Sequence, residues 1–129
     1  MNRADISFFL QDENKFGPIL AVDLLQYVQP GKVYVLNTKP SYEKGGHWVV
    51  LDMTGTTPYF FDSFGNSPSF YNLPLCNYSR KILQDKASDV CGIYCIYYIT
   101  MGGKALDRFG KNTKKNDKYL LKWFTRKYK

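Results

Sequence analysis

The stretch from residue 89 to 101, "DVCGIYCIYYITM", constrains the fold most strongly, because its apolar character is almost continuous. Its length favours a helix over a strand, and a helix with so few polar residues has to be buried. The glycine pair at 102 and 103 is a typical helix end. We therefore predict a buried helix here, with the other elements packed around it.

Shorter patterns predict the remaining elements. Helical spacing after Pro18 predicts a helix over 17–28, and an amphipathic pattern predicts a last helix over 117–128. Alternation predicts strands over 32–38, 47–53 and 57–64, the last two joined by the turn "TGTT", while 65–74 is a loop. The stretch 75–83 is ambiguous, and we interpret it as a strand. These elements predict a single α+β domain, residues 1–129, with a central antiparallel sheet, the buried helix and flanking helices.

The composition is that of a folded domain with a basic end. Hydrophobic residues make up 44% of the 129 residues, too many for a disordered chain. Of the 18 Lys and Arg residues, ten lie between residues 104 and 129, where only two acidic residues occur, and the net charge is +7. Such a stripe can contact nucleic-acid phosphates, or it can be an ordinary solvated helix face.

The chain has three cysteines, Cys76, Cys91 and Cys95, and starts without a basic-then-apolar signal segment. We therefore expect a reducing, intracellular environment. No apolar stretch reaches the roughly 20 residues that span a bilayer, so we expect no membrane segment. A zinc site would need the single histidine and all three cysteines to converge, and we predict no metal site. A disulfide between Cys91 and Cys95 would have poor geometry on a helix.

The one histidine, His47, starts a predicted strand in "EKGGHWVVLD", after two glycines that let the backbone approach another group. Asp62 ends the next strand. A turn centred near residues 54–55 pairs residues whose numbers sum to about 109, which places His47 opposite Asp62. The carboxylate would then orient the imidazole, as in a nucleophile–base–acid triad. The alternatives are a structural histidine and an aspartate that serves only in a turn.

Cys91 is the candidate nucleophile, because the start of a helix favours a thiolate. Cys95, one turn further on, is interpreted as a core residue. Gln84 offers an amide donor that, together with the backbone N–H of Cys91, could stabilise an oxyanion. We also expect substrate contacts from three residues beside these groups, with the indole shielding the triad: Gly46, Trp48 and Gly92.

The segments "GGHWVVLD", "YFFDSFG" and "Q…ASDVCGIYC" follow one another in the order His, acid, Gln, Cys. In these segments, and in "NT" at 37–38, the chain resembles the adenovirus-type maturation cysteine proteases, the adenain family, over most of its length. The wider clan includes the proteases that act on SUMO and other ubiquitin-like modifiers. The resemblance implies the α+β fold of that clan, cysteine protease activity, and catalytic roles for Cys91, His47, Asp62 and Gln84.

The resemblance also implies partners. Adenain is activated by DNA and by a viral peptide that forms a disulfide with a cysteine upstream of the nucleophile. Cys76 is therefore a candidate contact for an activating peptide, and the basic C-terminal region is a candidate contact for DNA, although the chemistry itself requires no cofactor. This chain departs from adenain in having Asp62 where adenain has Glu, in the spacing of Cys76 from Cys91, and in being shorter.

We therefore expect a cysteine endopeptidase of a virus or virus-like element that processes capsid or core precursor polypeptides in the virion and the infected host cell. Two alternatives stay open. One is a protease that removes a ubiquitin-like modifier. The other is a catalytically idle nucleic-acid-binding domain on the same scaffold, with the basic tail as its working part.

Overall fold

The apolar stretch after Asp89 forms helix α2 (Cys91–Met101), as predicted, in a computed structural model that describes residues 1–128. All residues from Gly92 to Tyr98 are buried. A buried tyrosine needs a partner for its hydroxyl, and the three in α2 donate to three different elements: Tyr94 to the carboxylate of Asp117, Tyr97 to the carbonyl of Ala105 and Tyr98 to the carboxylate of Asp52. These bonds let an almost wholly apolar helix carry polar groups in the core.

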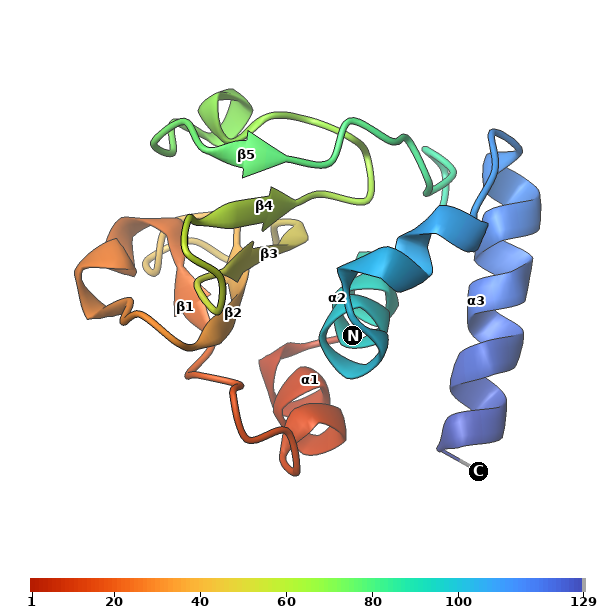
Figure 1. The fold of residues 1–129 in the computed structure, drawn as a ribbon, viewed down its shortest axis with the longest axis horizontal. Helices are drawn as coiled ribbons and strands as arrows, with labels where there is room; N and C mark the ends of the chain where they lie inside the picture. Colours follow the sequence, from red (N-terminus) through yellow and green to blue (C-terminus); the bar gives the residue numbers. More distant parts are fainter. Residues whose placement is uncertain (129) are drawn as a thin grey trace.

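A five-stranded sheet packs against α2, with strand order β1-β2-β3-β4-β5 (Figure 1). Its strands are β1 (Leu20–Ala21), β2 (Val33–Asn37), β3 (Trp48–Asp52), β4 (Tyr59–Phe61) and β5 (Asn77–Tyr78). Strands β2, β3 and β4 are antiparallel, as predicted, but β1 pairs with β2 and β5 with β4 in parallel. The α+β class is confirmed, whereas the prediction of an antiparallel sheet is wrong at both edges. Parallel neighbours need a crossover connection, and two 3₁₀ segments lie in these crossovers: η1 (Val22–Tyr27) and η2 (Pro68–Tyr71).

The helices α1 (Arg3–Leu10), α2 and α3 (Thr113–Lys127) lie on one side of the sheet, with α2 between the sheet and α3 (Figure 1). A third 3₁₀ segment, η3 (Gly103–Arg108), connects α2 to α3. One core cluster fills the space between the sheet and the helices, and a second covers the other sheet face beneath η1 and η2. The second cluster is built on Leu20, Tyr34, Leu36, Val49, Phe60 and Leu73.

Several boundaries differ from the sequence predictions. Residues 17–28 do not form an α-helix, because β1 and the kinked 3₁₀ segment η1 occupy most of this range. Only Asn77–Tyr78 of the stretch 75–83 is a strand, and α3 starts at Thr113 rather than at 117. Helix α1 was not predicted, although Asn2 and Asp5 form a capping box at its start. The predicted basic region extends to Lys129, which lies outside the described residues.

Candidate active site

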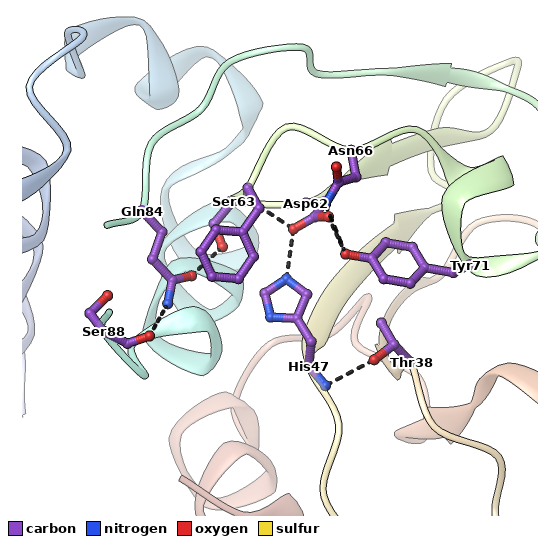
Figure 2. A network of polar contacts seen from close by, with 9 residues as sticks. Thr38, His47, Asp62, Ser63, Asn66, Tyr71, Gln84 and Ser88 are labelled. Carbon is purple, nitrogen blue, oxygen red and sulfur yellow. Dashed lines mark hydrogen bonds and ion pairs between the residues drawn. The ribbon is translucent and has the colours of Figure 1, made fainter. Parts of the chain in front are cut away.

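The imidazole of His47 and the carboxylate of Asp62 form the centre of the candidate site (Figure 2). The His47 Nε2 atom lies 2.6 Å from Asp62 Oδ1, and Asp62 is fully buried while His47 keeps a 16% exposed side chain. The backbone of His47 is anchored to Thr38 in both directions, since its N–H donates to the Thr38 hydroxyl and its carbonyl accepts from the Thr38 N–H. The predicted proximity of His47 and Asp62 is confirmed.

The strand register that produces this contact differs from the predicted one. Strands β3 and β4 pair Val50 with Phe61 and Leu51 with Phe60, so paired numbers sum to 111 rather than 109. A slip of two residues keeps every side chain on its predicted face, whereas a slip of one would reverse it. In this register Phe64 lies in line with His47, and the two rings stack with centroids 4.7 Å apart. Asp62 reaches the imidazole from a diagonal position.

The Asp62 carboxylate is held by three donors, of which the sequence analysis predicts only the His47 ring. Oδ1 accepts from the His47 ring and from the Phe64 N–H at 2.9 Å, and Oδ2 accepts from the Tyr71 hydroxyl. Burial raises the pKa of Asp62, but its hydrogen bond to His47 and the charge of that ring outweigh burial, so its pKa is lowered overall. Gly65, at φ +75°, turns the chain so that its own N–H bonds back to the Asp62 carbonyl. No sequence pattern singles out Tyr71, which η2 brings back from nine residues further along.

Cys91 is the first residue of α2, as predicted, and its side chain is partly buried beside the His47 ring. Burial raises the pKa of the thiol, but the side-chain interaction with His47 and the backbone N–H groups of Trp48 and Gly92 stabilise the thiolate, so the pKa is lowered overall. Because Nε2 is engaged by Asp62, Nδ1 is the ring nitrogen left to exchange a proton with Cys91.

The same contacts act on the imidazole. Burial lowers the pKa of His47, but the hydrogen bonds and charges of Asp62 and Cys91 outweigh it and raise the pKa to about 9. With the thiol pKa lowered and the imidazole pKa raised, the two side chains favour a thiolate–imidazolium pair near neutral pH. This is the protonation state of an activated cysteine nucleophile.

Gln84 is buried and lies next to Ser63 in the polar network (Figure 2). Its Oε1 accepts from the Ser63 hydroxyl at 2.6 Å, and its Nε2 donates one hydrogen to the Ser88 carbonyl at 3.0 Å. An amide nitrogen carries two hydrogens, so the second can serve a further acceptor. These bonds connect Gln84 to the loop of Asp62 and to the segment that leads into Cys91.

The three residues with predicted substrate contacts have different surroundings. Gly46 and Trp48 line a groove of ≈ 320 Å³, together with Asn37 and residues 1–3. Gly46 has φ +104°, and a Cβ there would lie 2.1 Å from Asn37 Oδ1, so only glycine fits. Gly92, in contrast, is buried, and a Cβ on it would meet the side chains of Met1 and Trp48. The small size of Gly92 therefore lets Met1 and Trp48 pack against the start of α2, and its contact with a substrate stays a prediction.

The other two cysteines lie away from this chemistry. Cys95 is buried in the core, and burial raises its pKa well above that of a free thiol, as expected for a core residue. Cys76 packs on the second core cluster, on the sheet face opposite α2, and burial raises its pKa as well. It lines an apolar groove of ≈ 200 Å³ between η1 and the loop after η2.

The basic residues of α3 are exposed: Lys114, Lys115, Lys118, Lys122, Arg126 and Lys127. Within residues 1–128, no group of three or more His, Cys, Asp or Glu side chains is arranged to bind a metal ion. Across the same residues, no helix combines the length and the apolar character needed to cross a bilayer. No protein-family model and no curated protein sequence matches the chain.

Proposed function

We propose that this chain is a cysteine endopeptidase in which Cys91 is the nucleophile, His47 the general acid–base and Asp62 the residue that orients the imidazole. The observation that carries the proposal is the short contact of His47 with the buried Asp62, beside a helix-terminal thiol of lowered pKa. Peptide hydrolysis by a cysteine nucleophile requires a thiol, a histidine beside it and a group that orients the histidine. Here the partly exposed Cys91 lies beside His47, and His47 contacts the buried Asp62.

The reaction starts from the thiolate–imidazolium pair. Cys91 Sγ attacks the carbonyl carbon of the scissile peptide bond, and the carbonyl oxygen becomes an oxyanion that accepts hydrogen bonds from Gln84 Nε2 and the backbone N–H of Cys91. His47 then gives its Nδ1 proton to the leaving amine as the C–N bond breaks, which leaves a thioester. Neutral His47 next takes a proton from water, the hydroxide attacks the thioester, and the thiolate leaves.

The proposed substrates are capsid or core precursor polypeptides of a virus or virus-like element, by resemblance to the adenain family. The groove beside Trp48 supports a polypeptide substrate, because it is open and it starts at the glycines that precede His47. The exposed cations of α3 support a contact with DNA, since a stripe of Lys and Arg binds phosphates through charge.

The test compares two cysteines that are one helical turn apart. Iodoacetamide at about pH 7 should alkylate Cys91 faster than Cys76 or Cys95, because only its pKa is lowered. In a fluorogenic peptide library, Cys91→Ala should abolish cleavage and Cys95→Ala should retain it. Loss of cleavage in Cys95→Ala but not in Cys91→Ala would refute the assignment.

Two further results would redirect the proposal. Cleavage of ubiquitin-like modifiers fused to a fluorophore, without cleavage of library peptides, would point to a deconjugating protease. Alkylation of Cys91 no faster than that of Cys76, together with salt-dependent DNA binding, would point to an idle binding domain.

A further inference from the structure

We propose that Tyr94, Asn116 and Asp117 are positioning residues that fix the main chain on both sides of Gln84, and we call these three residues the Gln84 tether. The proposal rests on the proposed function, because it assigns the tether to the oxyanion donor of that reaction. It gives α3, whose outer face is basic, a part in building the site.

The tether bonds the two neighbours of Gln84. Asn116 Nδ2 donates to the Leu83 carbonyl at 3.2 Å, and the Asp85 N–H donates to Asp117 Oδ2 at 3.2 Å. The Tyr94 hydroxyl donates to Asp117 Oδ1 at 2.7 Å and lies 3.2 Å from the Leu83 carbonyl. The residue before and the residue after Gln84 are therefore bonded to side chains of α2 and α3.

The burial of these side chains argues against a general surface role. Asn116 and Asp117 are 5% and 8% exposed, on a helix whose other polar side chains face outward. Among residues 1–128, the ion pairs involve other residues than Asp117. The cost of burying the Asp117 carboxylate is therefore offset by its hydrogen bonds alone. Burying such groups costs free energy unless their bonds are made. Apolar side chains would fill this position at a lower free-energy cost of burial. The presence of Asn116 and Asp117 is therefore explained by the hydrogen bonds that they make.

The consequence for Gln84 is that its side-chain direction is set from two sides. Ser63 and Ser88 hold its amide, and the tether holds the main chain from which the amide projects. An oxyanion donor acts through prior alignment, and small displacements of such a group lower the rate substantially. The Leu83 and Gln84 N–H groups also donate to the Ser63 carbonyl, next to Asp62. His47 and Asp62 are themselves held by other bonds, from Thr38, Phe64 and Tyr71, so loosening the tether should leave them in place.

The experiment compares Tyr94→Phe with Tyr97→Phe, a matched control. Both tyrosines are buried in α2 and both lose one hydroxyl, but the Tyr97 hydroxyl bonds the Ala105 carbonyl instead of the tether. With the best library peptide, Tyr94→Phe should lower kcat about tenfold at nearly unchanged KM, and Tyr97→Phe should leave kcat within about twofold. Alkylation of Cys91 by iodoacetamide should stay at the wild-type rate in both variants.

Further measurements separate a positioning role from a merely structural one. Asp117→Asn, which loses an acceptor, should reproduce the fall in kcat, and in a Gln84→Ala background neither substitution should lower kcat further. Equal losses of kcat in Tyr94→Phe and Tyr97→Phe, or losses that add fully to that of Gln84→Ala, would overturn the proposal. If the wild-type chain cleaves no peptide, hydrogen exchange still tests the tether: the Asp85 amide should exchange faster in Tyr94→Phe and Asp117→Asn than in Tyr97→Phe, and equal rates would refute it.

Discussion

His47 Nε2 lies 2.6 Å from Asp62 Oδ1 across the open end of the β3–β4 pair, although the two residues are 15 apart in sequence. In this contact Nε2 of the ring bonds to the carboxylate, which leaves Nδ1 to exchange a proton with Cys91. The same carboxylate is bonded by Tyr71 and by the Phe64 N–H. Asp62 therefore determines both the orientation and the charge of the His47 ring.

Replacing Asp62 by Asn should lower kcat/KM by roughly a hundredfold, because the amide keeps the shape but loses the charge that stabilises the imidazolium. The pKa of His47, followed by NMR of its ring protons, should fall from about 9. Asp52→Asn is the matched control, since Asp52 also accepts a tyrosine hydroxyl, from Tyr98, but lies at the far end of β3. Equal activity losses in both variants would contradict the role of Asp62.

The enzyme should remain active at pH values well below the ordinary pKa of a thiol. The His47 pKa is raised to about 9, so the imidazolium is lost as the pH rises through about 9, and activity should fall there. The Cys91 pKa is lowered, so the thiolate is lost only as the pH falls below that reduced value. Alkylation of Cys91 as a function of pH reports the acid limb. A rate that first appears above pH 9 would show an ordinary thiol instead.

Tyr71→Phe should lower kcat about tenfold, because a hydrogen bond to a charged carboxylate contributes more than a neutral one. Without this donor the pKa of Asp62 rises, so Asp62 loses its charge at a higher pH. The imidazolium, and the Cys91 thiolate paired with it, then lose the support of that charge, so the acid limb of the rate profile should move to higher pH. Tyr34→Phe is the control, a buried tyrosine on the same sheet face whose hydroxyl accepts the Gln29 N–H. A fall in thermal stability without a change in the pH profile would reduce Tyr71 to a packing residue.

Gly46→Ala should reduce both stability and activity, and Gly45→Ala should reduce stability alone. Both glycines have positive φ, which costs an alanine about 1 to 2 kcal/mol. Only at Gly46 would the new Cβ also collide with the Asn37 side chain, and the resulting shift would move the chain directly before His47. Thermal unfolding and kcat/KM measure the two effects. Similar kcat/KM values in the two variants would argue against this coupling.

The parts of the fold that local pattern decides were predictable. Helix α2 is predicted by its continuous apolar sequence, and the three central strands by their alternating patterns. The apolar stretch begins just before Cys91, so the position of Cys91 at the start of the helix was predicted correctly. The apolar spacing of the range 17–28 is helical and therefore predicts a helix. Tertiary pairing overrides that preference, since β1 hydrogen-bonds to β2 and leaves too short a segment for more than a 3₁₀ helix.

What the sequence could not supply is the set of contacts between distant segments. The β3–β4 register is two residues from the predicted one, because the connection spans 53–58 and is partly ordered by bonds from Thr54 to Asp52, which the pattern does not reveal. The bond of Tyr71 to Asp62 depends on how η2 returns to the sheet. The two edge strands are likewise set by crossovers, whose direction is decided by packing rather than by local composition.

The three tyrosine hydroxyls of α2 fix the rotation of the helix about its own axis. A helix with an entirely apolar surface could rotate or slide in an apolar core with little change in buried area. The hydroxyls of α2 prevent this, because they bond in three different directions: Tyr94 to α3, Tyr97 to η3 and Tyr98 to β3. Any turn of the helix would break at least one of these bonds and leave a polar group unpaired in the core. Because any two of these bonds, made in different directions, are enough to define the rotation, the helix has one angular setting, and Cys91 at its start keeps its position when a single hydroxyl is removed.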